Sequence, residues 1–213
     1  MKIVLFSGGV DSSTCLGMAR EYDKNVIPVF INYGQRHNKY EHMAAVNVSE
    51  HYGLELLELN LENIFKDGNS SLTDLSLDVS HGDYSNQTNA NTEVEFRNGV
   101  FLSILASLAM QYGADEIYFG AHKDDSGFIY PDCSPEFISS IDQAINIGTH
   151  GKVRVNAPFM YRTKSEIVAY GKTIKVPYEL TYSCYEGTYP PCGKCGTCID
   201  RNKAFKSNSL DIL

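Results

Sequence analysis

The 213-residue sequence contains no tryptophan, and its longest mostly apolar stretch, from Val100 to Met110, is too short to cross a membrane. The N-terminus lacks the charged and then apolar segment of a secretory signal. Basic residues are scarce, since 18 Lys and Arg stand against 26 Asp and Glu, and the net charge is −8. This balance gives no basic surface for a polynucleotide. We therefore expect a cytoplasmic protein that acts on small molecules, with no nucleic acid or membrane partner.

Disulfides are a weak explanation for the six cysteines if the protein is cytoplasmic. Four of them follow the spacing C-x7-C-x2-C-x2-C: Cys184, Cys192, Cys195 and Cys198. Four thiolates in one short segment suit a closed, tetrahedral and hence structural zinc site. An iron–sulfur cluster is the alternative, although the further cysteine and proline of the ferredoxin pattern are absent. Disulfides come third. Cys15 is expected in a helix core, and Cys133 as a loop thiol.

A glycine-rich stretch near the N-terminus reads F-S-G-G-V-D-S-S from Phe6 to Ser13, between an apolar strand and a helical pattern. Adjacent glycines let backbone N–H groups converge on an anion at a helix start. No Lys follows them, so this is not the loop that binds a γ-phosphate in P-loop enzymes. A plain turn at a helix N-cap is the alternative. Asp11 could cap the helix or help hold Mg²⁺. The residues expected to contact ATP are Phe6, Ser7, Gly8, Gly9, Val10, Asp11, Ser12, Ser13, Thr14, Cys15 and Leu16.

Apolar strand-like segments alternate with helical ones along the chain. Strands are expected at 3–6, 25–32, 54–59, 114–120 and 153–155, with helices near 14–20, 40–52, 99–112, 136–146 and from 163. This alternation predicts an α/β fold with a doubly wound, mostly parallel sheet. We expect an ATP-binding domain at 1–180 and a small zinc-binding segment at 181–213. Residues 67–92, which contain no Lys or Arg, are expected to form an insertion that closes as a lid, or a simple surface loop.

Several polar residues follow the expected strands, and ligands of such sheets lie at the carboxyl ends of the strands. The run Tyr33-Gly34-Gln35-Arg36-His37 comes directly after the second strand and could hold a base, a carboxylate or only solvent. His122 and Asp124 follow the fourth strand, as an acid–base pair or as an exposed polar loop. Asp132 lies between prolines, where it forms a turn or recognises an amino-pyrimidine edge.

Two basic residues stand near expected helix starts. Arg97 precedes a mostly apolar helix and could bind a phosphate or carboxylate bidentately, with a structural ion pair as the alternative. Thr163 and Glu166 match a capping box, which leaves Lys164 without a capping role. A lysine near a helix start is mildly disfavoured, so a phosphate contact is a reasonable role for Lys164.

These motifs together resemble the 7-cyano-7-deazaguanine synthase (preQ0 synthase, QueC) family of queuosine precursor biosynthesis, over nearly the whole chain. The motifs are F-S-G-G-V-D-S-S, Y-G-Q-R-H at Tyr33–His37, R-N at Arg97–Asn98, Y-P-D-C at Tyr130–Cys133, V-P-Y-E-L-T at Val176–Thr181, S-C-Y at Ser183–Tyr185 and C-G-K-C-G-T-C at Cys192–Cys198. The loop alone resembles the wider N-type ATP pyrophosphatases, which have an adenine nucleotide alpha hydrolase-like fold. Glu95 departs from the family pattern, where a proline is expected.

The resemblance implies an ATP-dependent carbon–nitrogen ligase. Such enzymes convert 7-carboxy-7-deazaguanine and ammonia to the nitrile through adenylated acid and amide, with ATP, Mg²⁺ and structural zinc, and often as homodimers. It implies catalytic roles for Asp11, Arg97 and Lys164, and substrate contacts from Tyr33, Arg36, Arg97 and Asp132. The alternatives are a related tRNA-modifying enzyme, a thiolase or lysidine-type ligase, and a non-catalytic ATP-binding zinc module.

Overall fold

The computed structural model describes residues 1–82, 91–123 and 130–211. Its centre is a five-stranded sheet in the order β3-β2-β1-β4-β5, in which every neighbouring pair is parallel. The strands are β1 (Lys2–Leu5), β2 (Val26–Asn32), β3 (Leu57–Asn60), β4 (Glu116–Tyr118) and β5 (Arg154–Asn156). The predicted doubly wound α/β fold is therefore confirmed.

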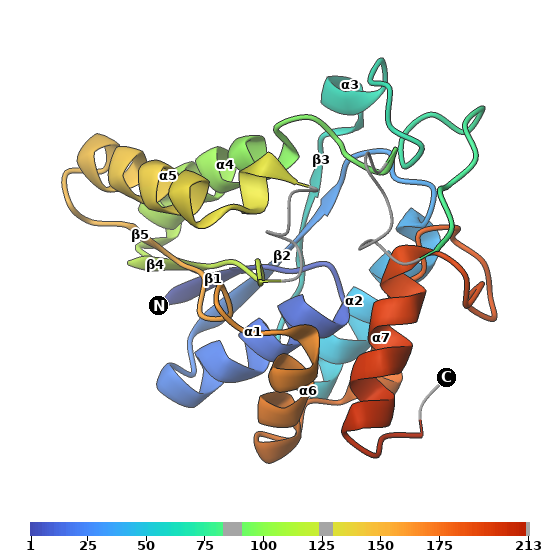
Figure 1. Ribbon diagram of the computed structural model, residues 1–213. Coiled ribbons are helices and arrows are strands. Elements are labelled where there is room, and N and C mark those ends of the chain that lie inside the picture. The colour runs from blue at the N-terminus through green and yellow to red at the C-terminus, as the bar shows by residue number, and fades with distance from the viewer. Residues whose placement is uncertain (83–90, 124–129, 212–213) are drawn as a thin grey trace.

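Helices cover both faces of the sheet. They are α1 (Val10–Tyr22), α2 (Asn38–His51), α3 (Glu62–Phe65), α4 (Arg97–Tyr112), α5 (Pro135–Gly148), α6 (Lys164–Thr173) and α7 (Gly196–Ser207), with 3₁₀ turns at Pro131–Cys133 and Tyr178–Leu180. Figure 1 shows α4 and α5 on one face and α1, α2, α6 and α7 on the other. The chain changes from one layer to the other between the neighbouring strands β1 and β4. In sheets of this type, that reversal point is where ligands bind.

The core follows from the alternation of side chains along the buried strands. Ile3 of β1 packs with Leu102 and Leu105 beneath α4, whereas its neighbour Val4 packs with Leu16 beneath α1. Both faces of β1 are thus apolar. This strand and the loop that follows it are fixed in the middle of the molecule.

The helix α7 was not expected, because its sequence is largely polar. Ala204 and Phe205 nevertheless join Val10 of α1 and Val168 of α6 in one apolar cluster. The buried side chain of Arg201 donates a hydrogen bond to Thr181 Oγ1 at 2.7 Å. The C-terminal residues therefore share a core with the helices of the sheet, and the division at residue 180 stays a prediction.

The described part of the 67–92 segment packs against the rest of the protein at several points. Leu72 and Val79 are fully or almost fully buried, while Leu75 and Leu77 are exposed. His81 forms an isolated β-bridge with Cys195. Residues 83–90 lie outside the described residues, and the proposed lid stays a prediction. Within the described ranges, no helix combines the length and the apolar character that a bilayer crossing requires.

Candidate functional site

A cavity opens at the carboxyl ends of β1 and β4, at the point where the chain changes layers. Leu5 and Phe6 form part of its floor from one strand, and Phe119, Gly120 and Ala121 from the other. Its remaining lining is Ser7, Gly9, Val10, Asp11, Ser12, Ile31, Tyr33, His37, Glu41, Arg97, Asn98, Phe101, Cys133, Lys164, Tyr182, Ser183, Tyr185 and Thr197. The lining combines apolar side chains with several polar and charged ones, as is usual for a small-molecule site.

The glycine-rich loop turns sharply into α1. Gly8 has a left-handed φ of +79°, and a Cβ at this position would lie 2.5 Å from the Ala45 backbone nitrogen of α2. Only glycine fits here. Gly9 is the N-cap of α1, and no side chain caps that helix end. The first backbone N–H groups of α1 are therefore available to an anion in the cavity.

The stretch expected to contact ATP divides into two parts. Ser7, Gly9, Val10, Asp11 and Ser12 line the cavity, as does Phe6, whereas Gly8 and Ser13 are not among the lining residues. The last three residues, Thr14, Cys15 and Leu16, are fully buried in the helix core. The Thr14 hydroxyl donates to the Val10 carbonyl at 2.8 Å, one helical turn back. These three residues lie away from the cavity because α1 has by then turned its apolar face to the sheet.

Asp11 joins two basic side chains at the cavity wall. Its Oδ2 lies 3.3 Å from Lys164 Nζ and 3.5 Å from His122 Nε2. Burial alone would raise the pKa of the Asp11 carboxyl, but Lys164 and His122 together hold it well below its usual range. Asp11 does not cap α1, and its Oδ1 is buried with no hydrogen-bond partner. That oxygen is the one suited to a cation such as Mg²⁺.

The environment of His122 differs from an exposed polar loop. This side chain is almost completely buried against the start of α1. The other member of the predicted acid–base pair, Asp124, lies outside the described residues. Sequence proximity to the end of a strand correctly indicated the position of His122, but not its burial or its contact with Asp11.

Arg97 is the first residue of α4, and it follows Phe96, whose φ of 55° is left-handed. Its guanidinium donates a hydrogen bond from Nη1 to the Tyr33 hydroxyl at 3.0 Å and lies 5.2 Å from the centre of the Tyr33 ring. The Nε atom is buried with no hydrogen-bond partner. Arg97 makes no ion pair with any residue that the structure describes. A guanidinium in this environment is suited to an anion.

The structure places the other two expected substrate residues away from the cavity lining. Arg36 donates to the Leu77 carbonyl at 2.7 Å and to the Asp74 carbonyl at 3.3 Å, which fastens the 67–82 segment. Asp132 Oδ2 accepts from the Asn98 backbone N–H at 2.8 Å and so satisfies the start of α4. Both side chains have structural partners, and their predicted contacts with the deazaguanine stay untested.

Sequence reasoning missed Glu41, and it named His37 only as part of the Tyr33–His37 run. Glu41 lies on α2, one turn after His37, and its carboxylate accepts a hydrogen bond from Gln35 Nε2 at 2.8 Å. Burial raises the pKa of Glu41 to about 7, even though Gln35, Arg97 and Ser7 act in the opposite direction. Burial lowers the pKa of His37 to about 3, so its ring is neutral. The (i, i+4) spacing of these residues was the available signal.

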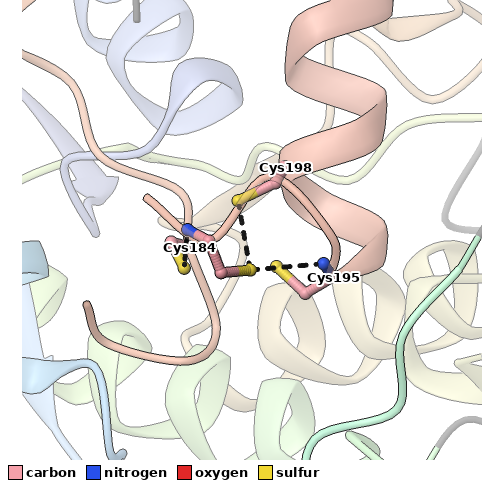
Figure 2. Close-up of side chains that lie close together, drawn as sticks. Cys184, Cys195 and Cys198 are labelled. Atoms are coloured by element: carbon pink, nitrogen blue, oxygen red, sulfur yellow. Dashed lines mark hydrogen bonds between the residues drawn. The ribbon is translucent and has the colours of Figure 1, made fainter. Parts of the chain in front are cut away.

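The four C-terminal cysteines converge just before and within the first turn of α7. Their sulfur atoms all lie within 4.8 Å of one another, and those of Cys192 and Cys198 are 3.9 Å apart. Figure 2 shows Cys195 and Cys198 beside the start of α7, facing Cys184. Ligands of a tetrahedral zinc–thiolate site lie about 3.8 Å from one another. The arrangement therefore fits one ion, whereas a multi-iron cluster would hold its thiolates farther apart.

This cysteine knuckle, residues 184–198, also borders the cavity. The Tyr182 backbone N–H donates to the Gly8 carbonyl at 3.1 Å. Ser183, next to the first cysteine, and Thr197, between the last two, both line the cavity. The residues next to the cysteine cluster therefore contact the glycine-rich loop directly.

Comparison with known proteins now adds to this geometry. A family model described as "Queuosine biosynthesis protein QueC" matches residues 1–209. The chain belongs to the QueC family. A 7-cyano-7-deazaguanine synthase of Picrophilus torridus is 40% identical over 212 residues, covering 95% of this chain and 86% of the relative. The synthase of the same name from Aquifex aeolicus is 39% identical over 215 residues, covering 96% and 95%.

Solved structures agree on the fold at much lower identity. An NMN synthetase from Francisella tularensis has a TM-score of 0.56 at 12% identity and covers all of this chain and 78% of its own. An NH3-dependent NAD synthetase from Campylobacter jejuni has a TM-score of 0.53 at 17% identity, covering 98% and 75%. This QueC family member therefore has the fold of those synthetases.

Proposed function

We propose that this QueC family member converts 7-carboxy-7-deazaguanine and ammonia into 7-cyano-7-deazaguanine, with two molecules of ATP consumed per nitrile. The observation that carries this proposal is the environment of Arg97 in the cavity. Arg97 is a half-buried cation, with a buried Nε and no carboxylate partner among the described residues, in the same cavity as a helix N-terminus suited to phosphates. A substrate that bears a carboxylate on a flat heterocycle complements Arg97, Tyr33 and the apolar floor.

The chemistry requires activation of a poor electrophile. A carboxylate oxygen attacks the α-phosphate of ATP, the bond to pyrophosphate breaks, and the resulting acyl adenylate carries a good leaving group. Ammonia then displaces AMP to give the amide, and a second adenylation of the amide oxygen leads to the nitrile. The contribution of the protein is to hold the reactants together and to stabilise charge.

The residues have separate roles in this scheme. The loop from Ser7 to Ser13 and the start of α1 bind the departing pyrophosphate, while Arg97 orients the substrate carboxylate. Lys164, next to Asp11, offsets the charge that develops on the leaving group. Asp11 fixes Lys164 and offers Oδ1 to Mg²⁺, which when bound screens the phosphate charges.

The accompanying properties are part of the same proposal. Zinc bound by Cys184, Cys192, Cys195 and Cys198 is structural, since all four positions of a tetrahedral ion are taken by protein. We further propose that the protein acts in the cytoplasm as a homodimer and takes ammonia free from solution. The net charge of −8 argues against a polynucleotide substrate.

The deciding assay is mass spectrometry of the purified protein with Mg²⁺, ATP, ammonium and 7-carboxy-7-deazaguanine. We expect the nitrile together with AMP. Nitrile with ADP would contradict adenylation, and an untouched base would contradict the substrate assignment. Arg97→Gln should lower kcat/KM for the acid at least 100-fold, on the scale of a lost charged contact to a reacting group. The exposed Arg162→Gln serves as the matched control.

A further inference from the structure

The cavity holds two carboxylates among the residues described as lining it, and they differ in their partners. Asp11 is neutralised by Lys164 at 3.3 Å. Glu41 has no lysine or arginine within ion-pair distance among the described residues. Its nearest basic atom is Nε2 of His37 at 3.6 Å, and that ring is neutral because burial lowers its pKa to about 3. Glu41 is therefore the carboxylate that is free to exchange a proton inside the cavity.

Glu41 lies close to both the glycine-rich loop and Arg97, the residue proposed to bind the substrate carboxylate. Its backbone carbonyl would be 2.9 Å from a Cβ placed on Gly8, so α2 touches the loop at this residue. Arg97 lines the same cavity, and its charge acts on the Glu41 carboxyl. If the loop binds phosphates and Arg97 binds the substrate anion, the acyl–phosphate bond forms between them. The carbon that accepts nitrogen is then next to Glu41.

We propose that Glu41 is the base that removes protons from the ammonia-derived nitrogen in both rounds of the reaction, an inference that rests on the function proposed above. In the first round, the nitrogen lone pair forms the C–N bond and the C–O bond to AMP breaks. The nitrogen becomes positive on attack and passes one proton to the Glu41 carboxylate, leaving the amide.

The second round uses the same position. The amide oxygen attacks the α-phosphate of a second ATP and pyrophosphate leaves. The nitrogen then loses its two remaining protons in turn to Glu41, which releases each to solvent. As the second proton departs, the C–N bond becomes triple and the C–O bond to AMP breaks. Ammonia has by then lost three protons, and both oxygens of the acid have left in AMP. One base beside one nitrogen suffices for all three transfers.

The surroundings of Glu41 suit this task. Gln35 Nε2 donates to Oε2 at 2.8 Å and fixes the carboxylate plane. The groups that face Glu41 are His37 at the N-cap of α2, Tyr33 after β2, Arg97 on α4 and Ser7 of the loop. Burial is the largest influence and raises the pKa of Glu41 to about 7, near the pH at which a base is most effective.

The test measures adenylation and nitrogen transfer separately in the variant Glu41→Gln. This substitution keeps the shape of the side chain and an oxygen that can accept the hydrogen bond from Gln35. Exchange of labelled pyrophosphate into ATP, with the acid present and ammonia absent, reports adenylation alone. We expect this exchange to stay within about 3-fold of wild type. Amide formation, and nitrile formation from added amide, should each fall about 100- to 10,000-fold. Glu50→Gln, an exposed glutamate on the same helix, should leave all three rates unchanged.

The pH dependence gives a second readout. At a constant concentration of free ammonia, amide formation by wild type should rise through an apparent pKa near 7, and Glu41→Gln should lose that limb. Equal losses in exchange and in transfer would overturn the proposal, because Glu41 would then only position ATP or the acid. The proposal would also be overturned if the rate of amide formation by the variant rose with pH in the same way as that of wild type. If wild type catalyses neither exchange nor nitrile formation, the proposed function itself has failed.

Discussion

The buried carboxyl of Glu41 should make the stability of the protein depend on pH in a way that Glu41→Gln removes. Burial raises the pKa of Glu41 from an ordinary value of 4.5 to about 7. The folded protein therefore binds this proton more tightly than the unfolded chain does. Glu41 has no effect on the free energy of unfolding while it is protonated in both the folded and the unfolded state. Its effect becomes destabilising as pH rises from about 4.5 to 7. Each pKa unit corresponds to about 1.4 kcal/mol, so the full penalty is about 3 kcal/mol.

The assay is urea unfolding of wild type and Glu41→Gln, without substrates, at pH 5 and pH 8. We expect the variant to be more stable by about 1 kcal/mol at pH 5 and by about 3 kcal/mol at pH 8. Taking the difference between two proteins at the same pH cancels the titration of other groups, including the metal ligands. Glu50→Gln should match wild type at both values. A gap between wild type and Glu41→Gln that is the same at both pH values would refute the raised pKa.

Three further changes test the loop and the metal site. Gly8→Ala forces a methyl group against the Ala45 nitrogen and should weaken ATP binding at least 10-fold in calorimetry; normal affinity would mean that the loop adjusts. Cys195→Ala should lose metal and soluble protein together, as measured by elemental analysis and yield, and a folded metal-free variant would contradict a structural ion. Asp11→Asn should retain the circular dichroism spectrum but lower kcat about 100- to 1,000-fold; near-normal turnover would remove Asp11 from the catalytic set.

Sequence reasoning succeeded where the signal was local. The strand before Phe6, the glycine turn and the capping box at Thr163 and Glu166 all depend on neighbours within a few residues, and each formed as expected. The four cysteines were also recognisable from spacing alone, because a metal ion imposes short ligand distances. The expected contact of Arg97 with a phosphate or carboxylate also came from its place at the start of a mostly apolar helix, and it stays a prediction.

The remaining site residues depended on partners far away in the sequence. Arg36 bonds the carbonyl of Leu77, and Asp132 bonds the N–H of Asn98, so neither could be assigned from its own turn. Glu41 looked like an ordinary acidic residue on a helix surface, since its (i, i+4) spacing from His37 does not show that the glycine-rich loop lies against it. The helix α7 was missed for a similar reason, because its buried Arg201 and Phe205 carry little periodic signal.

The bond from Tyr182 to the Gly8 carbonyl joins residues from opposite ends of the chain. Ser7 and Thr197, which line one cavity, are likewise separated by most of the sequence. During synthesis on the ribosome, the glycine-rich loop emerges well before the cysteine knuckle. Until the cysteine knuckle has left the ribosome, the cavity beside the glycine-rich loop lacks one wall. ATP then cannot stabilise the fold of the nascent chain by binding there. If the cavity binds a nucleotide as proposed, we expect that ability to appear only after residue 198 has been released and the four thiols have come together.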